Sequence, residues 1–319
     1  MAIEQVAVVG AGAWGTALAQ AAAMAGRQVT LVGRDVEVLN DIGRNHANSK
    51  HLGNIRLSPH ISASTRFGGA DLVILAVPAQ ATRAVLADFG RLTDPVVLTA
   101  KGLEDGTLKR QSEILAEMAP EAVSFILSGP SFATDVAAGR PTAVTLAGDY
   151  DDETETIAAA LAGPSFRLYA SRDIVGVELA GALKNVYALA AGAVDGARLG
   201  ASARAGLIAR AYAELSRVIP ALGGQAETLA GLAGLGDLAL SCTSEQSRNY
   251  RHGVALGRGD PQPPALAEGV FTAPVAKRLA NGAGVDAPLI EAVNLLLAGN
   301  VKIEKIVAGL MSRPLKREN

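Results

Sequence analysis

Three glycines near the amino terminus have the spacing of a phosphate-binding turn. Gly10, Gly12 and Gly15 form the pattern G-x-G-x-x-G directly after the β-branched run 6–9. The first glycine permits a tight strand-to-helix turn, the second lets the backbone approach a pyrophosphate, and the third lets helix and strand pack closely. The alternative is a glycine turn in another α/β fold. The strand pattern before the glycines and the helix pattern after them favour a dinucleotide-binding βαβ unit, with a phosphate at the helix amino terminus.

The residues after the second expected strand bear on the choice of nicotinamide cofactor. NAD-preferring sites usually place an acidic residue there, whereas an arginine accommodates the 2′-phosphate of NADP. The strand at 29–32 runs into Gly33, Arg34 and Asp35, so Arg34 occupies the discriminating position. The alternative is that Arg34 is a solvated loop cation. We expect a site that accepts NADP(H), with NAD(H) as the second choice.

Lys184 is the main candidate for acid/base chemistry. It lies inside the apolar segment 174–194, which has the composition of a helix. Glu178 lies six positions earlier, roughly 120° around a helix, so it is not an i,i+4 partner of Lys184. A buried ammonium has a lowered pKa, which suits a proton donor and acceptor near neutral pH. The alternative is that Lys184 extends its ammonium to the surface.

Two polar loops follow expected strands. Lys101 comes after the run 96–99, and the turn at 128–133 comes after the run 124–127. In open α/β sheets, ligands bind beyond the carboxyl ends of the strands. Each loop alone could be an ordinary surface turn, but their position after two strands favours a shared site.

A further cluster follows the glycine-rich segment 231–236. Asp237 could orient Lys184 and balance its charge, while Arg248 and Asn249 could bind a phosphate through fork-like donors. In the simpler interpretation the glycines end a helix and Arg248 is an exposed side chain.

The order of the expected elements places these residues in two domains. Strands and helical segments alternate in the first half, which predicts a parallel, doubly wound Rossmann-type sheet over residues 1–172. After Arg172 the strand pattern vanishes, which predicts an all-helical, substrate-binding domain over residues 173–319. The expected strands are 6–9, 29–32, 72–77, 96–99, 124–127, 143–147 and 166–170. The expected helices include 79–89, 111–118, 174–194, 203–219, 226–233, 272–280, 289–298 and 303–310.

Composition excludes several classes of protein. The 319 residues carry a formal net charge of −2, which gives no argument for nucleic acid or an anionic membrane surface as partner. The single cysteine, Cys242, excludes an internal disulfide framework, and the four histidines show no metal-ligand spacing. No secretory signal is recognised and every long apolar segment carries charges, so we expect a cytoplasmic protein. The apolar helical half favours a homodimer.

Taken together, the motifs resemble the bacterial NAD(P)-dependent sn-glycerol-3-phosphate dehydrogenase family. They occur in the family's order and cover most of the chain, and the GALKN and SRN blocks are the specific ones. They are GAGAWGTALA, TAKGL, LSGPSFA, ELAGALKN, GLGDL with CTSEQSRN, and AEG at residues 267–269. The family reversibly reduces dihydroxyacetone phosphate to sn-glycerol 3-phosphate with a nicotinamide cofactor, and the product enters phospholipid synthesis.

The resemblance implies a role for each matching residue. Lys184 would be the general acid/base at the C2 oxygen of the substrate. The other substrate-binding residues would be Lys101, Gly129, Ser131, Asp237, Ser247, Arg248 and Asn249. Besides the three glycines of the first motif, the cofactor would be lined by Trp14, Arg34, Lys101, Ala133, Arg248, Leu266 and Glu268. Leu266 stands where the family often has valine.

Without the resemblance, the residues indicate only an NADP-type dehydrogenase of a small phosphorylated or carboxylated compound. A 6-phosphogluconate- or hydroxyacid-type dehydrogenase also pairs such a sheet with a helical domain. A redox-sensing protein that binds NADPH without turnover is the alternative from another class. Lys184 separates enzyme from sensor, since only catalysis requires its proton.

Overall fold

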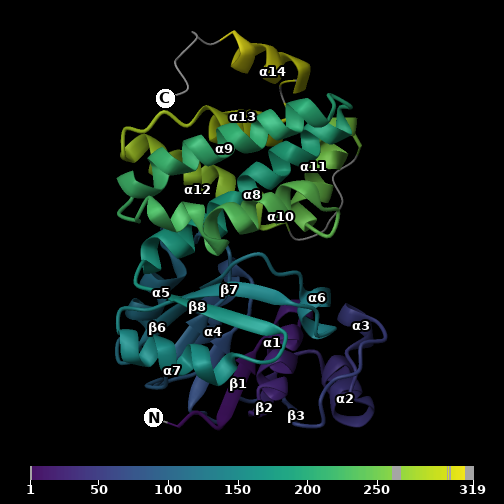
Figure 1. Ribbon diagram of the computed structural model, residues 1–319, viewed down its shortest axis with the longest axis vertical. Coiled ribbons are helices and arrows are strands. Elements are labelled where there is room, and N and C mark those ends of the chain that lie inside the picture. The colour runs from purple at the N-terminus through teal and green to yellow at the C-terminus, as the bar shows by residue number, and fades with distance from the viewer. Residues whose placement is uncertain (1, 261–266, 300, 302, 313–319) are drawn as a thin grey trace.

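A twisted sheet with helices around it forms the amino-terminal half of the molecule, and a stack of helices forms the rest (Figure 1). The computed structural model describes residues 2–260, 267–299, 301 and 303–312. The amino terminus lies at the far end of the sheet half, and α14 lies at the opposite end of the molecule. The two halves meet where the sheet faces the lower helices of the stack.

The sheet has eight strands in the order β3-β2-β1-β4-β5-β6-β7-β8, and every pair is parallel except β6 and β7. This confirms the expected Rossmann-type, mostly parallel sheet. The order reverses direction between β1 and β4, and this switch point is where open α/β sheets bind ligands. The strands are β1 (Gln5–Val9), β2 (Gln28–Val32), β3 (Ile61–Ser64), β4 (Leu72–Leu75), β5 (Val96–Leu98), β6 (Ser124–Ser128), β7 (Thr142–Ala147) and β8 (Phe166–Ser171).

Helices cover both faces of the sheet, so its central strands read as continuous apolar runs. All four residues of β4 are buried, for example. The helices of this half are α1 (Ala13–Met24), α2 (Val36–Asn45), α3 (Ser49–Leu52), α4 (Thr82–Ala87), α5 (Gln111–Met118), α6 (Ala133–Ala137) and α7 (Asp151–Leu161), with a 3₁₀ turn at Ala79–Ala81.

The described residues of the second half form helices joined by turns and loops and contain no strand, which confirms the expected helical domain. Its helices are α8 (Ile174–Gly196), α9 (Ala201–Ala221), α10 (Asp237–Thr243), α11 (Arg248–Arg258), α12 (Glu268–Gly282), α13 (Pro288–Leu297) and α14 (Ile303–Met311). The helix expected at 226–233 is wrong. A 3₁₀ turn (Glu227–Ala230) and a π turn (Leu232–Gly236) occupy this region, and the extended backbone of Gly231 separates them.

The long helix α8 is the centre of the helical half. It is long and apolar enough to cross a membrane, but 89% of its most apolar window is buried inside the protein, as in a core helix. It packs against α11 through glycines of both helices: a Cβ at Gly192, Gly196, Gly253 or Gly257 would overlap backbone of the partner helix. The backbones of α8 and α11 are therefore in direct contact, which fixes the start of α11 relative to α8.

Candidate active site

The turn between β1 and α1 has the geometry that the glycine spacing predicts. Gly10 has φ +118°, and a Cβ there would overlap the carbonyl oxygen of Ala76, which follows β4. A Cβ at Gly15 would overlap the carbonyl oxygen of Gly10, so α1 can approach the turn only without a side chain. A Cβ at Gly12, by contrast, would meet nothing within 4 Å. The open space at Gly12, beside the unpaired N–H groups of the first turn of α1, suits a pyrophosphate.

Other residues around this turn also fit a dinucleotide. The buried indole Nε1 of Trp14 has no hydrogen-bond partner among the described residues. At the end of β2, Arg34 is exposed, whereas the carboxylate of Asp35 is already engaged. Asp35 Oδ1 accepts from the backbone N–H of Glu37 at 3.1 Å, and its Oδ2 accepts from Lys50 Nζ at 2.7 Å. Arg34 is therefore exposed at the end of β2 and has no ion pair among the described residues.

Two lysines share one buried carboxylate at the junction of the halves. Lys101, which follows β5, donates from Nζ to Asp237 Oδ2 at 2.6 Å and to the carbonyl of Gly129 at 2.9 Å. Lys184, on α8, donates to Asp237 Oδ1 and also to Ser241 Oγ at 2.7 Å. The adjacent parallel strands β5 and β6 thus bring their following loops together, as the sequence predicts.

The environment of Lys184 brings the pKa of its ammonium close to neutral pH. Burial lowers the pKa of Lys184 to about 8; Asp237 opposes this shift, and the nearby charge of Lys101 adds to it. Burial opposes ionisation of Asp237, but the two lysines outweigh it and hold the pKa of Asp237 below its ordinary value. Burial raises the pKa of the Cys242 thiol to about 12, so Cys242 remains a neutral core residue.

The Glu178 carboxylate contacts the start of α5 and not Lys184, as its position on the helix predicts. Its carboxylate accepts from Ser112 Oγ at 2.6 Å and from Ser112 N at 3.0 Å, and Arg110 lies at 3.5 Å. Burial raises the pKa of this carboxyl group. Glu178 therefore joins α8 to the start of α5 and leaves Lys184 to Asp237.

The start of α11 brings together the residues expected to hold a phosphate. Ser247 Oγ accepts from the backbone N–H of Tyr250 at 3.3 Å and caps the helix, and Arg248 is exposed beside it. The side chain of Asn249 is buried and points inward: it donates to Asn185 Oδ1 at 2.8 Å and accepts from Gly269 N at 2.9 Å. The first-turn N–H groups of α11 and the exposed Arg248 guanidinium therefore lie at the same helix end, an arrangement of donors and positive charge that suits an anion.

Glu268 reaches from the start of α12 to the sheet half. Its Oε1 accepts from the backbone N–H of Ala79 at 3.4 Å, and its Oε2 is buried with no partner among the described residues. Burial raises the pKa of Glu268. The remaining expected residues lie in loops at the same edge: Ser131 Oγ donates to the carbonyl of Gly129 at 3.0 Å, and Ala133 begins α6. Leu266 lies outside the described residues.

Sequence reasoning missed Ser241, which contacts the Lys184 ammonium directly. A signal existed, because Ser241 lies four residues after Asp237 and therefore on the same face of α10. It also missed Asn185, whose amide donates to the carbonyl of Lys101 at 2.8 Å.

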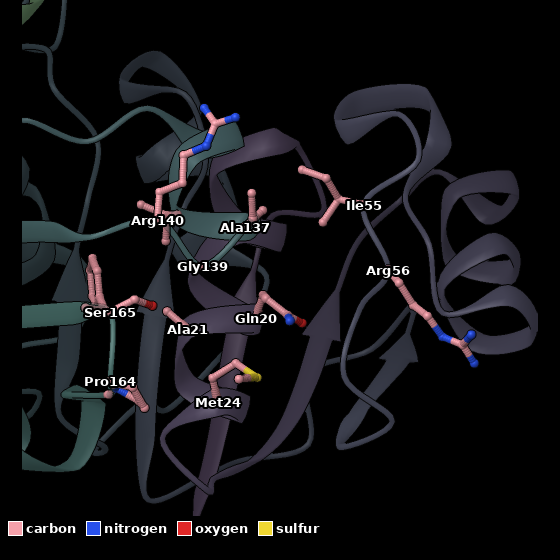
Figure 2. A pocket seen from close by; sticks show the side chains of 14 residues that line it. Gln20, Ala21, Met24, Ile55, Arg56, Ala137, Gly139, Arg140, Pro164 and Ser165 are labelled. Carbon is pink, nitrogen blue, oxygen red and sulfur yellow. The ribbon is translucent and has the colours of Figure 1, made fainter.

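A cavity of about 390 Å³ lies elsewhere, between α1, the end of α6 and the loop before β8. Figure 2 shows Arg56 and Arg140 at its border, with both guanidinium groups extending away from the lining around Ala21 and Ala137. Arg140 is paired with Asp135. Nothing in this arrangement points to a ligand, so the cavity is not part of the site.

A glycine turn of the dinucleotide-binding type in a Rossmann-type sheet, together with a buried lysine in a second, helical half, is typical of the class of nicotinamide-nucleotide dehydrogenases. Comparisons with known proteins give the family within this class. Residues 5–154 match the family model described as the N-terminus of NAD-dependent glycerol-3-phosphate dehydrogenase, and residues 173–308 match the corresponding C-terminus. The chain therefore belongs to the NAD-dependent glycerol-3-phosphate dehydrogenase family, which confirms the resemblance and makes it an oxidoreductase that uses NAD(P).

Individual relatives agree over the whole chain. The chain is 48% identical to a glycerol-3-phosphate dehydrogenase [NAD(P)+] from Brucella canis over 99% of both chains, and 48% identical to one from Caulobacter vibrioides over 100% of both. The crystal structure of glycerol-3-phosphate dehydrogenase from Coxiella burnetii is similar with a TM-score of 0.91 and 34% identity, covering 98% of this chain and 99% of that one.

Proposed function

We propose that the chain catalyses the reversible reduction of dihydroxyacetone phosphate to sn-glycerol 3-phosphate, with Lys184 as the general acid/base. Family membership supports the reaction. The observation that carries the mechanism is the buried Lys184 ammonium, which binds Asp237 and Ser241 and whose pKa is lowered by burial to about 8. A group with this pKa exists in both protonation states near neutral pH, as a reversible proton transfer requires.

The proton moves between Lys184 Nζ and the C2 oxygen of the substrate. In reduction, protonated Lys184 donates to this oxygen; in oxidation, neutral Lys184 removes the hydroxyl proton. Bound NADPH or NADH supplies the hydride for the carbonyl carbon. Asp237 stays ionised because its pKa is held low, so it orients Lys184 without competing for the proton. The second ammonium, on Lys101, stabilises the negative charge that develops on the oxygen.

The start of α11 would hold the phosphate of the substrate. Ser247 and Asn249 lie on either side of Arg248 there, and the first-turn N–H groups of the helix favour an anion. Arg248, at the boundary between the two ligands, would contact the phosphate and the cofactor. Gly129 and Ser131, next to the Lys101 ammonium, would complete the substrate pocket.

The cofactor would lie along the carboxyl ends of β1, β2 and β4. Its pyrophosphate would meet Gly10, Gly12 and Gly15, and Arg34 would bind a 2′-phosphate. The residues that would line the rest of the cofactor are Trp14, Lys101, Ala133, Arg248, Leu266 and Glu268.

Broader aspects of the proposal rest on the family and on composition. We infer a cofactor domain over residues 1–172 and a substrate domain over 173–319, a cytoplasmic location, and a product that supplies glycerophospholipid synthesis. We also infer a homodimer, because apolar side chains such as Phe271 and Leu295 are exposed on the helical half. Sedimentation of the purified protein measures this assembly directly.

The direct test is the decay of NADPH absorbance with dihydroxyacetone phosphate at neutral pH, repeated with NADH. Rapid oxidation that requires the substrate establishes the reaction, and the ratio of the two rates measures the cofactor preference. Absence of decay with either cofactor, in folded protein shown to bind NADPH, would contradict the proposed reaction.

A further inference from the structure

A chain of buried amides connects four segments of the active site. Asn185 Nδ2 donates to the carbonyl of Lys101 at 2.8 Å. Asn249 Nδ2 donates to Asn185 Oδ1 at 2.8 Å, and Gly269 N donates to Asn249 Oδ1 at 2.9 Å. Both asparagines are buried, with 5% and 7% of their surface exposed. The chain thus runs without interruption from the loop after β5 through α8 and α11 to the first turn of α12.

Every member of this chain is a residue of the proposed machinery or its direct neighbour in sequence. Lys101 itself binds Asp237, and Asn185 follows Lys184 on α8. On the other side, Asn249 follows Arg248 at the start of α11, and Gly269 follows Glu268. The amides therefore link the lysine side of the site, which meets the carbonyl end of the substrate, with the side that meets its phosphate.

The geometry leaves this link little freedom. A carboxamide donates from its nitrogen and accepts at its oxygen, so the two asparagines fix the direction of every hydrogen bond in the chain. A Cβ at Gly269 would lie 2.5 Å from the backbone oxygen of Asn185, so α12 begins directly against α8. The direct backbone contact between α8 and α11 likewise fixes the start of α11 against α8. A buried amide that loses its partner is left desolvated without a hydrogen bond, which costs free energy. This cost holds the chain of amides in one arrangement.

We propose that Asn185 is a positioning residue that sets the place of Lys101 relative to the phosphate-binding start of α11, which already packs directly against the helix of Lys184. This inference rests on the proposed function. Asn185 acts through two groups, the carbonyl of Lys101 and the side chain of Asn249. Lys101 belongs to the lysine side of the site through its ion pair with Asp237, and Asn249 belongs to the phosphate side at the start of α11. Its loss therefore impairs a substrate that must reach both sides at once, and has much less effect on a substrate that engages only the lysine side.

The experiment compares dihydroxyacetone phosphate with dihydroxyacetone, which lacks the phosphate, in wild-type enzyme and the Asn185→Ala variant. We expect Asn185→Ala to lower kcat/KM for dihydroxyacetone phosphate at least about tenfold more than for dihydroxyacetone, because remote binding groups act only when correctly placed. General damage to the fold reduces both values by the same factor, and that result would overturn the proposal. Asn185→Asp, which keeps the shape but cannot donate to Lys101, is the second variant and should show the same selectivity.

A cycle with Arg248→Ala gives an independent measurement with dihydroxyacetone phosphate alone. Asn185→Ala should cost less than about threefold in the Arg248→Ala background, because the placement of the phosphate no longer matters there. An equal cost in both backgrounds contradicts the proposal. Asn294→Ala is the matched control, since Asn294 Nδ2 donates to the carbonyls of Ala273 and Ile290 away from the site. Failure of the proposed function itself is recognised separately, by turnover that persists in Lys184→Ala.

Discussion

Lys101 and Asp237 are 136 residues apart in sequence, yet the ammonium of one lies 2.6 Å from the carboxylate of the other. Lys101 follows a strand of the sheet, whereas Asp237 begins α10 in the helical half. Their ion pair therefore joins the two halves at the point where Lys184 also binds Asp237. The arrangement of Lys184 therefore depends on this junction.

Replacement of Lys184 by alanine should remove the proton donor and leave the cofactor turn intact. We expect kcat to fall by about three orders of magnitude, within the range of general acid–base catalysis, while the Kd of NADPH changes less than about threefold. Steady-state kinetics and fluorescence titration with NADPH measure the two quantities. Lys277→Ala, which breaks an exposed ion pair with Glu291, is the control. Unchanged turnover in Lys184→Ala would sink the assigned role.

The pH dependence should differ in sign between the two directions of the reaction. Reduction needs protonated Lys184, so kcat/KM for dihydroxyacetone phosphate should fall as pH rises through about 8. Oxidation of sn-glycerol 3-phosphate needs neutral Lys184 and should gain activity over the same interval. Initial rates between pH 7 and 9.5 test this. If the rates of reduction and oxidation both rose or both fell with pH over this interval, the titrating group would not be Lys184.

Asp237→Asn should leave the buried ammonium of Lys184 and the partly buried ammonium of Lys101 without their shared counterion. We expect a loss of about 3–5 kcal/mol in the free energy of unfolding, as for a broken buried pair. Since Asp237 raises the pKa of Lys184, its loss should also move the limb for reduction to lower pH. Urea unfolding and the pH profile give the two readouts. As a control, Asp195→Asn removes a carboxylate bound to Arg204 and Tyr250, and should leave the pH limb in place. If the rate of reduction by Asp237→Asn still falls at about pH 8, the effect of Asp237 on the pKa of Lys184 is contradicted.

Ser241→Ala should impair turnover although sequence reasoning did not single out this residue. The hydroxyl accepts from Lys184 at 2.7 Å, and hydrogen bonds to charged groups contribute enough to predict a fall in kcat of about tenfold. The same substitution at Ser216, whose hydroxyl donates to a carbonyl within α9, should leave kcat unchanged. If both variants behave alike, Ser241 has no part in orienting Lys184.

Arg34→Ala should affect the two cofactors unequally. Loss of a charged contact to the 2′-phosphate should raise KM for NADPH about tenfold or more, whereas KM for NADH should change less than about threefold. Steady-state kinetics with each cofactor provide the comparison. Arg44→Ala, at an exposed position on α2, is the control and should change neither KM. A parallel change for both cofactors would place Arg34 outside the 2′-phosphate site.

The sequence predicts the sheet well where local signals are strong. Gly10, Gly12 and Gly15 determine their own turn, and the apolar runs of β1, β2 and β4 follow from burial on both faces. Strand β3 was missed because Ile61–Ser64 is short and half polar, and only pairing with β2 makes it a strand. The antiparallel direction of β7 depends on how the chain returns to the sheet after β6 and the short helix α6, which no strand pattern encodes.

The candidate site was predictable as a set of motifs, but not as a network of contacts. The residue patterns singled out Lys101, Lys184 and Asp237 and suggested that Asp237 orients Lys184, but nothing in their spacing shows that both lysines bind this one carboxylate. The segment before Asp237 misled the helix prediction, since apolar residues suggest a helix while Gly231 interrupts it. Asn185 likewise has no sequence signal for its contact with Asn249, which exists only because α8 and α11 touch.

The pairing of two ammonium groups with one carboxylate has an electrostatic consequence for substrate capture. The formal net charge of the chain is −2, so the molecule as a whole does not attract a phosphate ester. The lysine–aspartate group retains one unit of excess positive charge, and the side chains of Lys101 and Lys184 are only 15% and 9% exposed. The low-dielectric surroundings of these side chains concentrate the field of such a charge where they meet solvent. Arg248 lies exposed at the start of α11, where mobile ions can screen it, so rising ionic strength should slow encounter with the substrate more than it weakens the bound complex.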